Sequence, residues 1–447
     1  MVSESTGARL AERLGREQRE RRLPSVVAGV VRGGTLAWWG ARGAVGPDAT
    51  ATQYRIGSIT KTFVAVCVLR LRDEGRLDLL DPVERHLPDA PVGSTTVAQL
   101  LSHASGLRAE TDAPWWERTA GGDWQRLLAS MRPEALRHRP GRRFHYSNVG
   151  YAVLGELVQR LRGASWLDVV QAELLGPLGM TRTTPRPAAP AVPGLAVHPW
   201  ADVVLPEPEH DAGAMAPAGQ LWSSLADLAR WAAFLGGDTA GIVGPDTLAE
   251  MREPLVVDDQ PGLPWTGAYG LGVQVWNTGG RRSVGHGGSM PGFVALVRVD
   301  VDTADGVVAM TNTTAGFSPE LATDLTGILD EEPRDVDDWT PCDVGRDLLQ
   351  LCGYWYWGPV PMVLHAHAGR GLELRPVSGR GRPSRFRPTA EDAWTGLDGY
   401  FAGEPLRVVR GTDGRVAHLD VASFVLTRGP YDGDADVPGG VDPDGWR

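Results

Sequence analysis

Hydrophobic positions recur with two different periods along the chain. Between residues 96 and 235 they recur every three to four residues, which is typical of amphipathic or buried helices. The segments with this period are 96–103, 124–131, 149–161 and 225–235. Strand-like alternation is confined to either side of this region, around 26–39 and within 269–312. The pattern therefore predicts a helical region of about residues 82–225 with strands before and after it.

The character of the chain changes after residue 330. Residues 331–341 are rich in charge and proline, which indicates a linker. From 352 to 427, short strand-like pieces with Trp and Tyr alternate with Gly, Pro and Asp turns, which predicts a small all-β barrel or sandwich. We expect one domain over 1–330, an all-β domain over 342–430, and a disordered acidic tail over 431–447.

Charge and length exclude several classes of protein. The 447 residues carry 44 Lys and Arg against 55 Asp and Glu, a net charge of −11 that disfavours nucleic acid or an anionic membrane as partner. The longest apolar run, 63–69, is too short to cross a bilayer, and no basic-then-apolar signal pattern opens the chain. Three cysteines with no CxxC spacing give no disulfide framework. These features predict a cytoplasmic protein acting on a small molecule.

Lysine usage points to one position. Lys61 is the only lysine, so arginine supplies every other basic side chain. A guanidinium stays charged, whereas a desolvated ammonium can lose its proton and act as a base. Lys61 is therefore a candidate catalytic residue.

Ser58 precedes this lysine by three residues, where the buried segment 63–71 begins and before Gly75, a residue suited to a helix C-terminus. Positions i and i+3 share one face of a helix, which brings the hydroxyl and the amine together. The backbone N–H groups of a helix start favour developing negative charge. Ser58 is the candidate nucleophile and Lys61 its base.

Two further motifs lie downstream. Tyr146 and Asn148 flank Ser147, the expected N-cap of the helix through 149–161, where a phenol can relay protons and an amide can orient a carbonyl. The second is His286-Gly287-Gly288-Ser289, between strand-like segments at 269–276 and 293–301. Its glycines allow a close backbone approach, and a strand edge there would complete an oxyanion hole.

In order and spacing, Ser58-x-x-Lys61, Tyr146-x-Asn148 and His286-Gly287-Gly288 resemble the three motifs of the serine β-lactamase and penicillin-binding superfamily. The resemblance is to the branch with class C β-lactamases, D-alanyl-D-alanine carboxypeptidases, D-amino-acid peptidases and β-lactamase-like esterases. The stretches 100–107 and 217–223 agree with that branch. It implies an α/β (α+β) fold: a mostly antiparallel sheet flanked by terminal helices, with an all-helical subdomain.

The resemblance also implies a mechanism. Ser58 forms an acyl-enzyme, Lys61 shares proton transfer with Tyr146, and the N–H groups of Ser58 and Ser289 form the oxyanion hole. Asn148 and the His286–Ser289 stretch contact substrate, and His286, where many relatives have lysine, supplies charge or a hydrogen bond near Tyr146. Trp115, Trp116 and Trp222 are candidates for lining the acyl pocket, although packing roles fit them equally. Which of Lys61 and Tyr146 is the base stays open.

One departure from the family pattern bears on substrate. Relatives that act on peptides or β-lactams commonly have a threonine or serine hydroxyl at the position of Gly287, which helps to hold a carboxylate. With that hydroxyl absent and His286 neutral above its ordinary pKa of ~6.5, we expect a small ester or amide substrate, esters preferred. A D-amino-acid peptidase, a carboxypeptidase or a β-lactamase is the alternative. A catalytically silent fold that binds a ligand or partner is the rival of another class.

The remaining features predict no further chemistry. No G-x-S-x-G elbow and no H-E-x-x-H motif is present. The basic cluster at 380–387 and the pair His365 and His367 are interpreted as solvated strand faces, because the net charge opposes nucleic acid and no third metal ligand is evident. We expect no cofactor and no metal; the oligomeric state stays open.

Overall fold

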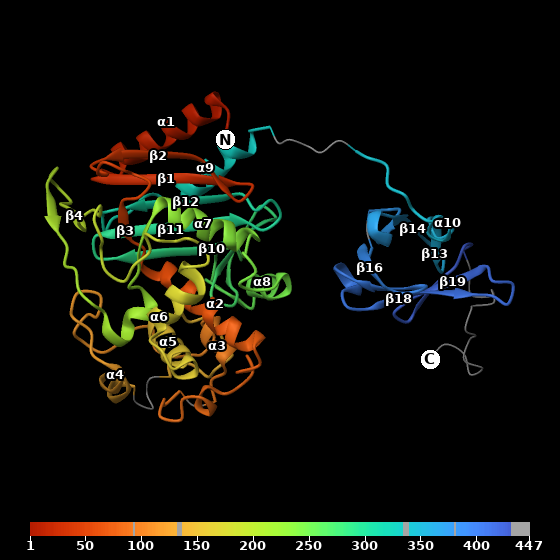
Figure 1. Cartoon of the computed structure of the whole chain (residues 1–447), viewed down its shortest axis with the longest axis horizontal. Helices are drawn as coiled ribbons and strands as arrows, with labels where there is room; N and C mark the ends of the chain where they lie inside the picture. Colours follow the sequence, from red (N-terminus) through yellow and green to blue (C-terminus); the bar gives the residue numbers. More distant parts are fainter. Residues whose placement is uncertain (93, 132–135, 334–338, 380, 431–447) are drawn as a thin grey trace. The chain divides into compact units, whose positions relative to one another are not determined.

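Two units make up the chain, Met1–Arg334 and Asp335–Arg447. The computed structural model describes residues 1–447 except 93, 132–135, 334–338, 380 and 431–447 (Figure 1). The predicted linker at 331–341 lies in part outside the described residues, as does Arg380 of the basic cluster, and the predicted disordered tail at 431–447 lies wholly outside them. None of the described helices is both long and apolar enough to cross a membrane.

An eight-stranded antiparallel sheet forms the centre of the first unit, in the order β2-β1-β12-β11-β10-β9-β8-β7. Its strands are β1 (Ser25–Arg32), β2 (Thr35–Gly43), β7 (Val256–Val257), β8 (Gly267–Tyr269), β9 (Gln274–Thr278), β10 (Arg281–Met290), β11 (Phe293–Asp300) and β12 (Gly306–Thr311). Pairing of β1 with β12 joins the N-terminal hairpin to the meander. The predicted antiparallel sheet is confirmed.

One predicted strand is wrong in its extent. The segment 269–276 is divided between β8 and β9, because residues 270–273 turn the chain back on itself. At Gly272 the backbone has φ +91°, a conformation that favours glycine, and its N–H donates to the Leu101 carbonyl. The turn therefore ties the sheet to the helical region.

Both faces of the sheet are covered. Along β1, alternate side chains belong to different cores: Val26, Ala28 and Val30 pack with the terminal helices α1 (Glu4–Glu20) and α9 (Glu320–Asp330). Val27 and Val31 pack into the larger core shared with the helical region. Figure 1 shows α1 and α9 near the β1–β2 edge of the sheet. This two-sided burial explains why β1 is apolar at successive positions.

The four predicted helical segments are confirmed as α3 (Val97–Leu101), α4 (Trp124–Ser130), α5 (Asn148–Arg162) and α7 (Leu225–Gly236). Helix α6 (Trp166–Val170) also belongs to this region, whereas α8 (Pro245–Met251) lies after it in the chain. The expectation of an all-helical subdomain is wrong in one respect, because short strands interrupt it. These are the hairpin β4 (Leu195–Val197) and β5 (Val204–Pro206), and β6 (Trp222–Ser224), which pairs with β3 (Gln53–Arg55). Strands of three residues are too short to show a period of two.

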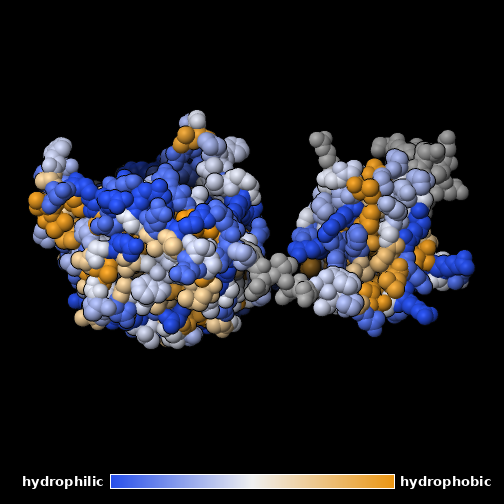
Figure 2. All heavy atoms as spheres, turned by 90° about the horizontal axis from the view of Figure 1, so that it is seen from above, coloured by the Kyte–Doolittle hydropathy of each residue, from blue (hydrophilic) through white to orange (hydrophobic). Residues whose placement is uncertain are grey.

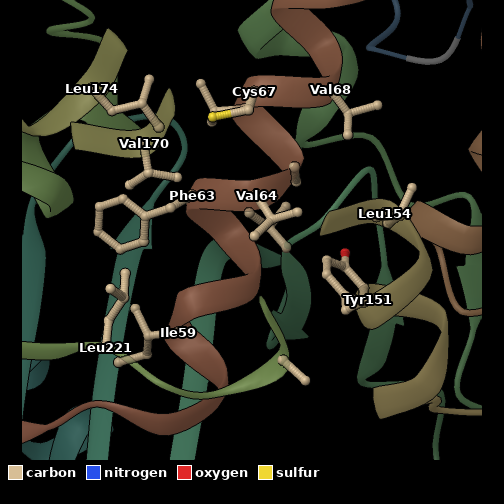
Figure 3. Packing of buried hydrophobic residues seen from close by; sticks show 14 of the residues in the cluster. Ile59, Phe63, Val64, Cys67, Val68, Tyr151, Leu154, Val170, Leu174 and Leu221 are labelled. Carbon is tan, nitrogen blue, oxygen red and sulfur yellow. The ribbon is translucent and has the colours of Figure 1, made fainter. Parts of the chain in front are cut away.

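Helix α2 (Thr60–Asp73) lies at the centre of the main core. Figure 3 shows Phe63 and Val64 of α2 among side chains from α5, α6 and the segments that contain Leu174 and Leu221. The side chains from Thr60 to Leu69 are all buried. The helix ends before Gly75, which has φ +69° as predicted. Surrounded in this way, α2 has little freedom to move, and the residues at its start are fixed with it.

The second unit is an up-and-down meander of eight antiparallel strands. They are β13 (Gly353–Trp357), β14 (Val360–Ala366), β15 (Leu372–Pro376), β16 (Ser384–Ala390), β17 (Ala393–Gly396), β18 (Pro405–Arg410), β19 (Val416–Val421) and β20 (Phe424–Leu426). Reciprocal backbone hydrogen bonds of 2.8 and 2.9 Å between Tyr356 and Thr427 join the first strand to the end of the last. The predicted β domain is therefore a barrel, which removes the open edges of the sheet.

Candidate active site

Ser58 lies in a 3₁₀ turn, Gly57–Ile59, directly before α2. The α-helix therefore begins two residues later than the serine, and the prediction that Ser58 stands at the start of a buried helix is confirmed within that margin. Gly57 has φ +52°, and a Cβ there would lie 2.6 Å from the backbone nitrogen of Ser289. Only glycine fits this turn, because the turn and β10 are in backbone contact.

Lys61 reaches back from the first turn of α2 to the serine. Its Nζ donates to the Ser58 Oγ at 2.9 Å and to the carbonyl oxygen of Ala218 at 2.6 Å. The side chain is fully buried. Burial lowers the pKa of Lys61 to about 7, against a smaller opposing effect of Glu110 and Glu117. Near neutral pH, a large fraction of this amine is unprotonated beside a serine hydroxyl.

Tyr146 faces the same pair from the entry of α5. The Ser147 hydroxyl accepts from the Gly150 N–H at 3.0 Å, so Ser147 is the N-cap as predicted and fixes the residues on either side of it. The Lys61 Nζ lies 5.0 Å from the centre of the Tyr146 ring. Burial raises the pKa of Tyr146 above its usual value, and a hydrogen bond with Ser58 partly opposes the rise. The phenol stays protonated at neutral pH.

His103 packs behind Tyr146, with ring centres 4.1 Å apart. Its Nδ1 accepts from the Ser147 N–H at 3.0 Å, and the residue has φ +57°. Burial lowers the pKa of His103 well below its usual value, so the ring is neutral. The sequence showed this histidine only as part of the stretch 100–107. In the structure it supports the backbone and the ring that position Tyr146.

Two carboxylates that sequence reasoning missed lie beside Asn148. The Asn148 Nδ2 donates to Glu110 Oε1 at 2.7 Å, while its buried Oδ1 has no hydrogen-bond partner among the described residues. Glu117 lies nearby, and burial raises its pKa. Both carboxylates come from the irregular segment between α3 and α4, which has no periodic pattern that would have marked them.

The third motif lies on β10, which passes the serine turn. Strand β9 pairs with β10 only as far as Gly285, so residues 286–290 have the Ser58 turn as their neighbour on that side. A Cβ on Gly288 would lie 1.9 Å from the Ile56 carbonyl oxygen, whereas one on Gly287 would have 3.8 Å to the Gln274 side chain. The two glycines therefore differ: position 288 has no room for a side chain, whereas position 287 does.

His286 is not a source of positive charge. Burial lowers its pKa to about 3, with Lys61 as a further cause. Its Nδ1 donates to the Gly287 carbonyl, so its Nε2 accepts from the Tyr269 hydroxyl at 2.7 Å. The expectation of a charge or hydrogen bond near Tyr146 is corrected accordingly, because both ring nitrogens are bound elsewhere and the ring centre is 6.2 Å from that of Tyr146.

A cavity of about 600 Å³ opens over these groups. Its lining joins the three predicted motifs with residues that the sequence did not single out. It includes Ser58, Glu110, Glu117, Tyr146, Asn148, Gln274, Trp276, His286, Gly287, Gly288, Ser289 and Arg298. Lys61 lies beneath Ser58 and does not reach the cavity wall. The nucleophile is accessible while its amine partner is not.

The three candidate tryptophans do not line this cavity. Trp222 is buried in β6 with its ring against Phe293, at 4.9 Å between centres. Trp116 is buried, and its indole nitrogen donates to Glu110 at 2.6 Å; the exposed Trp115 donates to Glu117 at 2.9 Å. The pocket assignment is therefore corrected: Trp115 and Trp116 hold the two carboxylates that face the cavity.

No group of three or more His, Cys, Asp or Glu side chains is placed to hold a metal ion in the part of the chain that the structure describes. His367 instead contacts Glu373 at 3.0 Å.

Comparison with known proteins agrees with this geometry. Residues 9–329 match the family described as Beta-lactamase, and residues 344–428 match a domain of unknown function, DUF7586. Protein flp of Staphylococcus aureus (strain COL) is 25% identical over 286 residues, which are 61% of this chain and 55% of that protein. The chain thus matches little more than half the length of this curated relative.

Two solved structures extend the comparison. A D-stereospecific amidohydrolase from Streptomyces sp. is 28% identical with a TM-score of 0.61, over 71% of this chain and 97% of that one. The structure titled SurE is 26% identical with a TM-score of 0.61, over 95% of this chain and 99% of that one. The superfamily and fold expected from the three motifs are confirmed.

Proposed function

Because the chain belongs to the beta-lactamase family, we propose that it is a serine hydrolase that cleaves a small ester or amide through an acyl-enzyme on Ser58. The observation that carries the proposal is the buried amine of Lys61, 2.9 Å from the Ser58 hydroxyl oxygen, with its pKa lowered to about 7. A group with this pKa suits general-base catalysis near neutral pH.

In the first half of the proposed reaction, neutral Lys61 takes the Ser58 proton as Oγ bonds to the substrate carbonyl carbon. The bond to the leaving group then breaks, and the protonated Tyr146 phenol gives the leaving group its proton. Lys61 returns a proton to Tyr146. In the second half, water attacks the acyl carbon and its proton passes to Lys61. The bond between the acyl carbon and Ser58 Oγ then breaks, protonated Lys61 returns its proton to Oγ, and the acid product leaves. The raised pKa of Tyr146 favours Lys61 as the first base.

The negative charge that develops on the carbonyl oxygen needs donors. We assign the backbone N–H groups of Ser58 and Ser289 to this role, as the family resemblance implies. The contact between β10 and the serine turn supports this assignment, since it holds the two segments at a fixed separation. Preorganised donors of this kind are worth about 2.7–4 kcal/mol each in the transition state.

A fluorophosphonate probe tests the nucleophile. We expect covalent labelling on the peptide that contains Ser58, located by mass spectrometry, and no labelling of Ser58→Ala. Ser105, a buried serine outside the proposed mechanism, provides the control, and Ser105→Ala should label normally. An adduct on any other serine with Ser58 unmodified would disprove the assignment.

Within this class we propose that the substrate carries no carboxylate beside the scissile bond. Gly287 offers no hydroxyl, His286 is neutral, and two carboxylates face the cavity. Arg298 also lines the cavity, but its guanidinium donates to the Ser283 hydroxyl at 2.7 Å and lies 5.2 Å from the centre of the Trp276 ring. Neutral esters fit this surface better than penicillins, cephalosporins or peptide C-termini.

A second candidate is an amide or ester of an amino acid with a free ammonium group, and specifically a D-amino acid. Glu110, Glu117 and the unpartnered Asn148 Oδ1 present acceptors to the cavity, which favours a cation. The Streptomyces relative is a D-stereospecific amidohydrolase, and a second SurE structure, 25% identical, is titled with D-Leu. These likenesses support a D-configured acyl group.

Steady-state kinetics separates the candidates. The panel is p-nitrophenyl butyrate, D- and L-phenylalanine p-nitroanilide, the N-acetyl D-anilide and nitrocefin. If kcat/KM is lower for the N-acetyl D-anilide than for the free D-anilide, and Glu110→Gln restores kcat/KM for the N-acetyl substrate, the site recognises an ammonium group. Equal kcat/KM for the two anilides would favour the simple esterase. A kcat/KM for nitrocefin above all others would contradict both and favour a β-lactamase.

A further inference from the structure

The β barrel of the second unit contains a cavity at one end. In an up-and-down meander, alternate connections lie at the same end of the barrel. Trp357 and Val360 flank the β13–β14 turn, Arg382 precedes β16, Phe401 lies between β17 and β18, and Phe424 begins β20. All five line one cavity of about 100 Å³. The cavity is thus the mouth of the barrel, on the side of these four connections.

The opposite end is closed. Helix α10 (Arg346–Leu349) leads into the start of β13, and Leu348 and Leu351 are buried in the barrel core. The Arg428 guanidinium lies 3.9 Å from the centre of the Trp355 ring and donates to the carbonyls of Cys352 and Tyr354. The barrel therefore has one plugged end and one end with a cavity.

The cavity has an apolar floor and a rim that includes an aromatic side chain. Its floor is formed by buried side chains: Met362, Leu374, Phe401 and Leu426. The rim carries Trp357 and Val360, both more than a third exposed. In Figure 2, hydrophobic residues gather in a band on the visible face of this unit. Eight-stranded barrels have an interior that can hold one small ligand.

One cation stands in this apolar setting. The Arg382 guanidinium lies 3.9 Å from the centre of the Tyr400 ring, 4.9 Å from that of Phe424 and 5.5 Å from that of Trp357. Its Nη1 is buried and has no hydrogen-bond partner among the described residues. A buried donor without an acceptor is costly, and a carboxylate is the acceptor that guanidinium groups bind best.

We propose that the barrel mouth binds a short-chain monocarboxylate, with its alkyl tail on the apolar floor and its carboxylate on Arg382. The size of the cavity favours a short chain, since it is smaller than the roughly 150 Å³ engineered cavity that holds benzene. The rings hold the guanidinium in place, so the ligand meets a cation that is already oriented. This site is separate from the hydrolase site proposed for the first unit.

The other arginines of this segment do not share the feature. Arg385 pairs with Asp398 at 2.5 Å, and Phe386, expected on a solvated strand face, is buried in the barrel core. Arg387 is exposed on the outer face of β16. Arg382 is thus the member of the described basic cluster that meets the cavity, and Arg387 provides a matched control.

Isothermal titration of the full-length protein with hexanoate, hexan-1-ol and hexylammonium tests the proposal. We expect saturable binding of hexanoate at one site and at least tenfold weaker binding of the alcohol. Arg382→Gln should weaken hexanoate binding at least tenfold and Arg387→Gln should leave it unchanged. Arg382→Lys, which keeps the charge, should retain part of the affinity, with circular dichroism reporting that each variant folds.

Three outcomes would overturn the proposal. Equal affinity for hexanol would mean a purely apolar pocket. Tighter binding of hexylammonium would mean that the aromatic rim accepts a cation in place of Arg382. No hexanoate binding, or binding that Arg382→Gln leaves intact, would remove the carboxylate site from the barrel.

Discussion

The two units differ in what shifts the pKa values of their ionisable groups. Around the cavity of the first unit, burial shifts the pKa values of Lys61, His103, Tyr146 and His286. In the barrel, the carboxyl groups of Asp347, Glu373 and Asp392 have lowered pKa values chiefly because arginines contact them near the surface. Surface ion pairs contribute little to stability, whereas burying a titratable group is costly.

This difference supports the proposal that catalysis takes place in the first unit. Burial of Lys61 gives an amine with a pKa of about 7, much of which is unprotonated near neutral pH, whereas a solvated lysine with a pKa of ~10.4 stays protonated. The barrel buries apolar side chains and keeps the carboxyl groups of Asp347, Glu373 and Asp392 near the surface, so its described groups are suited to binding.

Replacing the buried amine should have the largest effect. We expect Lys61→Met to lower kcat for p-nitrophenyl butyrate by at least ~100-fold, because a general base contributes about 10²–10⁴. The thermal midpoint should stay the same or rise, since a desolvated amine is removed. Arg70→Met, on the same helix but partly exposed, is the control and should retain activity. Near wild-type turnover in Lys61→Met would contradict proton abstraction by this residue.

Lowering the pH should reduce activity by protonating Lys61. With the pKa of Lys61 lowered to about 7, the amine is protonated below that pH and cannot accept the serine proton. The value of kcat/KM should therefore fall about tenfold per unit as pH drops below 7, and level off above it. A stopped assay from pH 5 to 9 measures the profile. A flat profile between pH 5 and 7 would show that a group of lower pKa serves as the base.

Adjacent glycines of β10 should differ. Gly288→Ala places a Cβ against the Ile56 carbonyl and should cost about 1–3 kcal/mol of unfolding free energy, with loss of activity as the serine turn moves. Gly287→Ala has room and should change neither by much. Chemical denaturation and ester kinetics compare the two variants. Equal effects would mean that close backbone contact with the turn is not what the site needs.

Removing the barrel should have the smallest effect on chemistry. A chain that ends at Arg334 keeps the hydrogen bonds between Ser3 and Glu332 and the whole lining of the cavity over Ser58. We expect kcat/KM for a small activated ester within about threefold of the full chain. Loss of activity in a folded truncation would show that the barrel contributes to the site.

The sequence anticipated the elements that have strong local signals. Ser147 was readable as an N-cap and 149–161 as its helix, because capping and a period near 3.6 act over a few residues. Ser58 and Lys61 could be paired from their spacing, since positions three residues apart on a helix share a face. The three-residue strands and the division of 269–276 carry no such signal, and they depend on partners distant in the chain.

What the sequence by itself determined is the identity of the candidate catalytic groups and the helix or strand on which each one lies. Tertiary packing decided their chemical state. Burial lowers the pKa of Lys61 to about 7 and makes His286 neutral, with its two ring nitrogens bound to Tyr269 and Gly287. Packing likewise turned Glu110 and Glu117 toward the cavity and Trp222 away from it. A pKa and a direction of exposure depend on everything that surrounds a side chain, and most of those neighbours are remote in sequence.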